Sequence, residues 1–172
     1  MTCVVGEERK EGEAVGPQQF RDVAGHFATG VCIVTAEDPV SGPHGMTLNS
    51  LTTVSADPAT LLICLNRAST THEVVARAGR FAVTILAADQ GELAALFATR
   101  ADDKFDRIEW ERSPSGVPVL PGSLARLECV VLDSHDVHTH TVVIGQVVDA
   151  VAEGGSPLVF HRSRMSAPLV DR

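Results

Sequence analysis

The stretch Gly45-Met46-Thr47-Leu48-Asn49-Ser50-Leu51-Thr52-Thr53-Val54-Ser55-Ala56-Asp57-Pro58 carries small polar side chains where a packed strand would carry Val or Ile. Threonine favours strands, whereas Asn and Ser disfavour them. The polar side chains are bunched, and between them lie the apolar residues Met46, Leu48, Leu51 and Val54. We predict one long strand over residues 45–58 that lines a pocket for a flat, partly polar ligand. An edge strand with solvated hydroxyl groups is the alternative.

The length, composition and net charge of the chain limit which kinds of partner it can bind. Its 172 residues are enough for one domain with a sizeable core, and 44% of them are hydrophobic. The net charge of −8 disfavours non-specific binding to nucleic acid or to an anionic membrane surface. No apolar run reaches the roughly 20 residues of a membrane-spanning helix. We therefore expect neither a nucleic-acid partner nor a membrane partner, and an anionic cofactor would need a local cationic pocket.

The four cysteines indicate a reducing compartment. Cys3, Cys32, Cys64 and Cys129 do not form a CxxC motif or a Cys/His cluster with metal-binding spacing. The last three lie in apolar runs typical of strands, where a free Cys behaves as a small hydrophobic residue. The first residues also lack the apolar segment of a signal peptide. We predict three buried thiols in a soluble, cytoplasmic protein.

The rest of the chain predicts a mainly β domain with short flanking helices. Residues 1–16 are charged and are predicted to be a flexible tail, followed by one domain over residues 17–172. Short turns between strands favour antiparallel pairing, and the absence of regular βαβ alternation argues against a doubly wound sheet. We predict a closed or nearly closed antiparallel Greek-key barrel of six or seven strands. The other strands are expected at residues 31–36, 61–65, 81–86, 124–132, 141–151 and 156–160. Helices are expected at 17–29 and 90–98, and a third, short helix is expected to follow an N-cap in the polar turn at residues 66–71 and to run through residue 78.

Several short motifs, in this order and spacing, resemble the short-chain flavin reductase family. They are Phe27–Val31 (FATGV), Gly45–Ser50 (GMTLNS) with Val54–Pro58 (VSADP), Phe81–Val83 (FAV), Phe97 with Asp103–Phe105 (DKF), and Leu127–Cys129 (LEC). The resemblance covers about residues 18–165. It implies the FMN-binding split-barrel fold and a homodimer. It also implies reduction of FMN or FAD by NADH or NADPH and delivery of the reduced flavin to a separate flavin-dependent monooxygenase.

The resemblance also implies which residues contact the flavin. Arg67 and Lys104 are candidates to neutralise its phosphate, because a guanidinium or ammonium group pairs well with phosphate oxygens. For Lys104, a solvated charged run at residues 101–104 is the alternative. The cofactor-binding residues expected in this way are Thr47, Asn49, Ser50, Ser55, Cys64, Leu65, Asn66, Arg67, Thr71, Lys104 and Phe105.

The residues expected to contact the nicotinamide of NADH or NADPH are predicted from a second motif. The family commonly places Gly-Asp-His before an Ile/Val-Gly-Val run, and His140 matches that His, so it is our candidate catalytic residue. Here His138-Thr139 replaces Gly-Asp, which removes a carboxylate that could orient the imidazole. A metal site at His135, His138 and His140 is the alternative. We favour no metal, because no complete set of ligands is present.

The C-terminal segment Leu158–Met165 resembles the part of the family that borders the nicotinamide dinucleotide. His161, Arg164 and Met165 are therefore predicted to contact it. A plain basic tail is the alternative.

These observations together predict an NAD(P)H:flavin oxidoreductase. A non-enzymatic flavin-binding or electron-carrying protein of the same fold, or a flavin enzyme acting on another small substrate, are the alternatives. The sequence distinguishes neither FMN from FAD nor NADH from NADPH.

Overall fold

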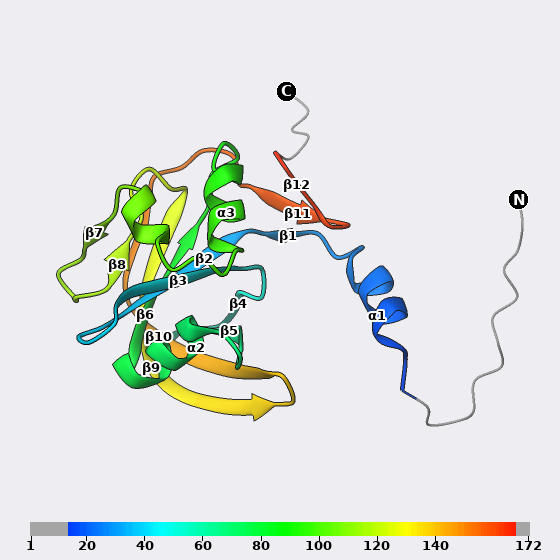
Figure 1. Cartoon of the computed structure of the whole chain (residues 1–172), viewed down its shortest axis with the longest axis horizontal. Coiled ribbons are helices and arrows are strands. Elements are labelled where there is room, and N and C mark those ends of the chain that lie inside the picture. The colour runs from blue at the N-terminus through cyan, green and yellow to red at the C-terminus, as the bar shows by residue number, and fades with distance from the viewer. Residues whose placement is uncertain (1–13, 168–172) are drawn as a thin grey trace, which may run out of the picture.

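The computed structural model describes residues 14–167 and is dominated by a seven-stranded antiparallel sheet (Figure 1). The strand order across this sheet is β3-β2-β6-β9-β10-β5-β4. The prediction of a mainly β, antiparallel fold with short flanking helices is confirmed. The strands are β2 (Cys32–Asp38), β3 (Gly42–Leu48), β4 (Thr52–Ala56), β5 (Ala59–Asn66), β6 (Arg80–Ile85), β9 (Ala125–Val137) and β10 (His140–Ala152).

The connection between β3 and β4 shows why this sheet must curl. These two strands form its opposite edges, yet only residues 49–51 separate them in the chain. Four Cα steps from Leu48 to Thr52 span at most about 14 Å. The edges of a flat sheet of this size would lie about 29 Å apart, at about 4.8 Å per strand spacing. The sheet is therefore bent into an open barrel, as the split-barrel prediction requires.

The same connection corrects the prediction of one strand over residues 45–58. Asn49, Ser50 and Leu51 interrupt the strand, because Asn and Ser are poor strand formers. The Ser50 hydroxyl instead accepts a hydrogen bond from the Cys64 amide at 3.0 Å and lies 3.2 Å from the Cys64 carbonyl oxygen. Ser50 thereby fixes the crossing segment against β5.

The helices agree with the prediction except at the first one. They are α1 (Pro17–Ala24), α2 (Thr70–Ala78), α3 (Gly91–Phe97) and a 3₁₀ helix, η1 (Lys104–Arg107). The prediction that α1 continues to residue 29 is wrong. Its last turn is capped at Gly25, whose amide donates to the Arg21 carbonyl, so Phe27 lies beyond the helix. Among the described residues, no helix is long and apolar enough to cross a membrane.

Two small sheets complete the fold. β1 (Thr29–Gly30), β11 (Val159–His161) and β12 (Arg164–Ser166) form one, and β7 (Glu111–Arg112) pairs with β8 (Pro118–Val119) in the other. The predicted last strand thus leaves the barrel. The predicted basic tail first turns back into β12, through Arg162 and Ser163 in left-handed conformation.

The end of the β9–β10 hairpin also differs from the prediction. The polar residues 133–140 were expected to form the connection, but β9 runs to Val137 and the turn is only His138-Thr139. The backbone ladder needs no apolar side chains, so strand pairing continues through Asp133–Asp136 although both faces are exposed there.

The core lies on both faces of β2. Cys32, Val34 and Ala36 belong to the barrel interior, whereas Ile33 packs with Phe97 of α3 on the other face. Burial raises the pKa of the Cys32 and Cys129 thiols to about 12. Cys64 is only partly buried, because β5 alternates its side chains between the core and the opposite face. Cys3 and most of the predicted tail lie outside the described residues.

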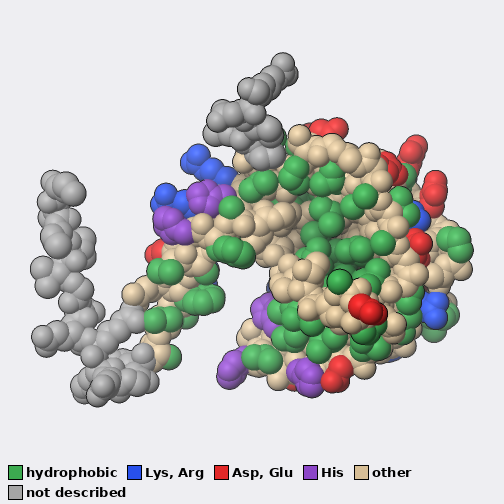
Figure 2. Space-filling model, turned by 180° about the vertical axis from the view of Figure 1, so that it is seen from behind, with side chains coloured by type: hydrophobic (Ala, Val, Ile, Leu, Met, Phe, Trp, Pro, Cys, Tyr) green, Lys and Arg blue, Asp and Glu red, His purple; other side chains and the backbone are tan. Residues whose placement is uncertain are grey.

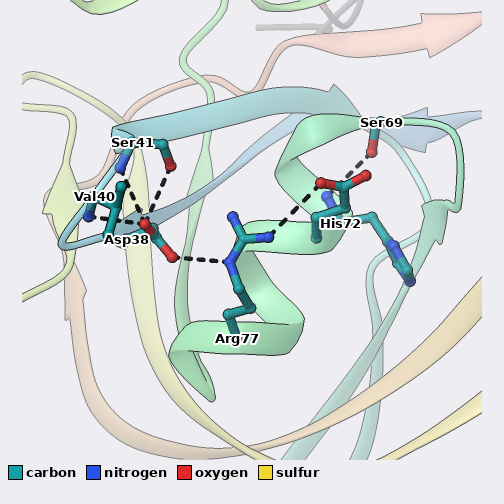
Figure 3. Close-up of polar contacts among 7 residues, drawn as sticks. Asp38, Val40, Ser41, Ser69, His72 and Arg77 are labelled. Carbon is teal, nitrogen blue, oxygen red and sulfur yellow. Dashed lines mark hydrogen bonds and ion pairs between the residues drawn. The ribbon is translucent and has the colours of Figure 1, made fainter.

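Helix α2 is anchored at both ends (Figure 3). Ser69 caps its first turn by accepting from the His72 amide, and Gly79 ends it at φ 66°. Near its C-terminus Arg77 donates from Nε to Asp38 Oδ2 at 2.9 Å. The other oxygen of Asp38 accepts from the amides of Val40 and Ser41 in the β2–β3 turn. The C-terminal part of α2 is therefore tied to the β2–β3 turn.

Candidate functional site

A cavity of about 500 Å³ opens between β3, the start of α2 and the segment from α3 to η1. It is lined by residues 43–47, by residue 66 with residues 68–71, and by residues 97–102 with 104–105. Its volume lies within the usual range for small-molecule sites. The wall combines hydroxyl and amide groups with the apolar side chains of Met46, Phe97 and Phe105.

The β3 wall depends on a missing side chain at Gly45. A Cβ at this position would lie 2.7 Å from Cε1 of Phe97 and 3.0 Å from the Val34 carbonyl oxygen. The Phe97 ring therefore packs directly on the strand backbone. Lys104 reaches over that ring and donates to the Gly45 carbonyl at 3.2 Å. Close to it, the Thr47 hydroxyl donates to the Ala94 carbonyl of α3 at 2.7 Å.

The α2 wall presents the positive end of a helix. The first amide groups of a helix have no intrahelical partner, and the helix dipole adds partial positive charge there. Thr70 and Thr71, the first residues of α2, both line the cavity. In front of them Asn66 accepts from the Ala68 amide at 2.9 Å, which shapes the turn into the helix. This arrangement suits an anionic group.

The charges of the cavity also favour an anion. Arg100 and Lys104 line it together with the single acidic residue Asp102. Burial lowers the pKa of Lys104, and Asp102 opposes this shift. The Nε2 atom of His44 is buried without a hydrogen-bond partner. A ligand that brings an anionic group and a hydrogen-bonding edge would satisfy both groups.

His140 lies next to this cavity on the neighbouring strand. It is the first residue of β10 and pairs across the ladder with Asn66, which lines the cavity. Its Nδ1 atom lies 2.9 Å from the Thr139 hydroxyl, and its side chain is exposed. His138 lies in the turn, so it does not share a strand face with His140 as the metal alternative requires. Among residues 14–167, no three His, Cys, Asp or Glu side chains are grouped as metal ligands.

The other nicotinamide candidates lie elsewhere, on the three-stranded sheet. His161 and Arg164 pair across β11 and β12, and Met165 is exposed. The His161 ring also lies 6.4 Å from that of His26, which follows α1. Figure 2 shows Arg and His side chains gathered at this corner beside the α1 segment. None of the three candidates lines the cavity.

Comparison with known proteins decides the family. A family model described as a flavin reductase like domain matches residues 24–168. The chain belongs to this family. It is 44% identical to the FMN reductase (NADH) SmoA of Agrobacterium fabrum, over 83% of this chain and 81% of SmoA.

A second relative is HsaB of Rhodococcus jostii, the reductase subunit of a flavin-dependent monooxygenase. It is 37% identical over 100% of this chain and 88% of HsaB. Among solved structures, the NADH:FAD oxidoreductase SgcE6 of Streptomyces globisporus C-1027, in complex with NAD and FAD fragments, superposes with a TM-score of 0.83. The two share 34% identity over 93% of this chain and 100% of SgcE6.

The structure brings only part of the predicted cofactor residues together. Thr47, Asn66, Thr71, Lys104 and Phe105 line the cavity. Asn49, Ser50, Ser55, Cys64, Leu65 and Arg67 do not line it.

Three of these residues have other roles that explain their absence from the lining. Leu65 is fully buried in the core, so its side chain is not available to a ligand. Ser55 lies in the exposed strand β4 and accepts from the Asp57 amide in the turn that follows. Arg67 pairs with Asp136 at 3.2 Å and turns toward the β9–β10 hairpin. The alternative of a merely solvated Lys104 is wrong, because this side chain is partly buried at the cavity and donates to the Gly45 carbonyl.

Sequence reasoning missed several residues of the cavity. His44, Ser69 and Arg100 all line it. Arg100 precedes an acidic run that is typical of a solvated surface, and His44 has no partner in the sequence pattern. Only Ser69 carried a signal, because it belongs to the predicted N-cap turn at residues 66–71.

Proposed function

We propose that this chain is a flavin reductase that transfers hydride from NADH or NADPH to FMN or FAD and supplies the reduced flavin to a separate monooxygenase. The observation that carries the proposal is the cavity beside α2, with its hydroxyl and amide wall, its apolar side chains and its cationic end, in a member of the flavin reductase family. The named activities of SmoA, HsaB and SgcE6 support it.

The residues of the cavity fit a flavin. Met46, Phe97 and Phe105 supply apolar contacts for the ring faces, and Thr47 and Asn66 supply hydrogen bonds for its polar edge. Lys104, Arg100 and the first turn of α2 would hold the phosphate. The unpartnered Nε2 atom of His44 gains a hydrogen-bond partner from the ligand. The site thus offers a partner for each chemical part of the cofactor.

The flavin and the protein residues have separate roles in the proposed reaction. When bound, the flavin supplies the hydride-accepting chemistry. The chain's own residues hold the ring, neutralise the phosphate and keep His140 beside Asn66 at the edge of the cavity. We place the nicotinamide at this edge, with the free Nε2 atom of His140 turned toward it.

A homodimer is part of the same proposal. All eight residues of α1 escape burial, and Phe20, Val23 and Phe27 are 61%, 68% and 77% exposed. An isolated helix this short is marginal in water, so a partner surface must cover it. The outer face of the β9–β10 hairpin carries exposed Val130, Leu132 and Val148. Reciprocal packing of α1 on this face of a second copy would cover both surfaces. His161, Arg164 and Met165 stand beside α1 and would then border a site shared by two copies.

The proposal is tested by nicotinamide oxidation. Purified protein is mixed with NADH or NADPH, each with FMN, with FAD and without flavin. We expect oxidation with at least one nicotinamide only when flavin is present. Tight flavin binding without oxidation of either nicotinamide would instead support an electron carrier, and no response to any flavin would overturn the proposal.

A further inference from the structure

The hairpin turn that carries His140 is tied to the start of α2 by a network of polar side chains. At its centre the Thr141 hydroxyl lies 2.6 Å from Asp136 Oδ1 and 2.9 Å from His72 Nε2. The second oxygen of Asp136 is 3.2 Å from the guanidinium of Arg67. We call these four residues, Arg67, His72, Asp136 and Thr141, the hairpin clamp.

Each bond of the hairpin clamp has a defined direction. A hydroxyl carries one hydrogen, and a carboxylate only accepts. Thr141 therefore donates to Asp136, and it must accept from His72, which places the imidazole hydrogen on Nε2. Thr141 is 4% exposed, so its two bonds are shielded from water, although Arg67 and Asp136 reach the surface. Removing this one hydroxyl would break both bonds at once.

The hairpin clamp also fixes the neighbours of His140. The Arg67 amide donates to the Thr139 carbonyl at 3.0 Å, and its guanidinium donates to the His138 carbonyl at 3.3 Å. The Thr139 hydroxyl in turn contacts Nδ1 of His140 at 2.9 Å. A continuous set of contacts therefore leads from α2, through Arg67 and the turn, to the imidazole of His140.

The β5–β10 ladder ends at the His140–Asn66 pair, and beyond it little other than this network would hold the turn in place. The side chains of residues 132–140 are exposed on both faces of the hairpin, so apolar packing adds little there. Segments with few buried contacts open at low free-energy cost. Beyond the β5–β10 ladder, which ends at the His140–Asn66 pair, the polar contacts with α2 and Arg67 are thus the restraint on the turn next to His140.

From this geometry we infer that the hairpin clamp is a positioning device, with Thr141 as its central residue, that holds His140 in register with the flavin cavity. The inference rests on the proposed function, because His140 acts there on the nicotinamide side. It also gives Arg67 a role other than the phosphate contact predicted from the sequence. The hairpin clamp would thereby orient His140 in place of the adjacent Asp, which His138-Thr139 has replaced in this sequence.

The test compares Thr141→Val with Thr141→Ser in the full chain. Valine keeps the shape and removes the hydroxyl, whereas serine keeps the hydroxyl. We expect Thr141→Val to lower kcat about tenfold or more, which corresponds to loss of a positioned group. Flavin affinity should change less than about threefold, since the anchors Ser69 and Asp38–Arg77 lie outside the clamp. Thr141→Ser should stay near the wild-type kcat. Equal kcat values for the two variants would overturn the inference.

Thr84→Val is the matched control for a buried threonine. Thr84 is fully buried in β6, and its hydroxyl has no hydrogen-bond partner. Its replacement should leave kcat unchanged, which separates loss of the clamp from loss of any buried hydroxyl. A fall in kcat equal to that of Thr141→Val would overturn a specific role for Thr141.

Amide hydrogen exchange gives a readout that needs no turnover. In protein without nicotinamide, the amides of Arg67 and of residues 136–141 should exchange faster in Thr141→Val than in wild type, and at the wild-type rate in Thr141→Ser. If wild type oxidises neither nicotinamide, the proposed function fails while the exchange rates still test the restraint. Equal exchange rates in all three proteins would overturn the hairpin clamp itself.

Discussion

Beside the cavity, several charged groups are paired within the chain, whereas the corner formed by α1 and the β1–β11–β12 sheet leaves large apolar side chains exposed. Beside the cavity, Arg77 pairs with Asp38, Arg67 with Asp136, and Lys104 with the Gly45 carbonyl. At the corner, Phe20, Val23 and Phe27 are exposed near Arg162 and Arg164. In the proposed dimer, one chain builds the cavity by itself, and a second copy completes the corner.

The largest expected effect comes from removing exposed apolar side chains of α1, which should prevent dimer formation. Replacement of both Phe20 and Val23 by Ser removes two apolar side chains, each worth about 1.5–3 kcal/mol when fully buried. In a symmetric dimer this loss occurs twice. We expect the variant to be monomeric at concentrations where the wild type is a dimer, as measured by sedimentation or light scattering. Val40→Ser is the control, because Val40 is 95% exposed in a turn of the cavity side. An unchanged dimer in the double variant, or a wild-type monomer, would contradict the proposed interface.

On the cavity side, Lys104→Met should weaken flavin binding. A hydrogen bond to a charged group contributes about 1.5–3 kcal/mol, which is about ten- to a hundredfold in Kd. The measurement is a fluorescence titration with FMN and FAD. Arg107→Met is the matched control, because Arg107 is an exposed cation of the same 3₁₀ helix and does not line the cavity. Equal losses in the two variants would mean that general charge, not the cavity, attracts the flavin.

Gly45→Ala tests how closely the cavity wall is packed. The added methyl group would meet Phe97 and the Val34 carbonyl, so the ring must move. We expect a loss of about 1–3 kcal/mol in the free energy of unfolding, the usual cost of overpacking, together with weaker flavin binding. Urea unfolding and the same titration measure both. Gly91→Ala provides the comparison, since a Cβ there meets nothing within 4 Å. A wild-type free energy of unfolding and a wild-type Kd for Gly45→Ala would contradict tight packing of this wall.

The smallest effect is expected at the anchor of α2. The hydrogen bond from Arg77, with the amides of Ser41 and Val40, holds the pKa of Asp38 well below its usual range. Its stabilising contribution is therefore complete above the unfolded pKa of about 3.9 and is lost as the pH falls through the folded value. Asp38→Asn should be less stable than wild type at neutral pH, and the difference should narrow as the pH falls below about 4.

Urea unfolding at several pH values measures this difference. Asp89→Asn is the control, because Asp89 is an exposed carboxylate on the surface. A constant difference between Asp38→Asn and wild type at all pH values would contradict the role of the charge.

Local pattern was sufficient to predict much of the fold. Ser69 and Gly79 mark the ends of α2 in the sequence, because a cap and a left-handed glycine act within a few residues. The apolar run of β5 and the β-branched run of β2 predicted buried strands for the same reason. Asn49 and Ser50 disfavour a strand, but the break at residues 49–51 was not predicted, since the contact of Ser50 with Cys64 exists only where the two sheet edges meet.

The candidate site was predictable only where its residues are close together in the sequence. Asn66 and Thr71 are close in sequence, so their motif predicted one wall of the cavity. Leu65 and Arg67 lie within the same motif, but strand alternation turns Leu65 into the core and Asp136 draws Arg67 to the hairpin. Phe97 and Gly45 are far apart in sequence, and their contact appears only once the barrel has closed.

The sequence by itself determined the family, the antiparallel β class and the local ends of most helices and strands, because these depend on composition, periodicity and short motifs. The tertiary structure alone decided that residues 45–58 split between opposite edges of a curled sheet. It also decided which side chains of that stretch face the cavity, and that the Thr141 hydroxyl lies between Asp136 and His72. Those features depend on contacts between residues distant in the chain, which no local pattern encodes.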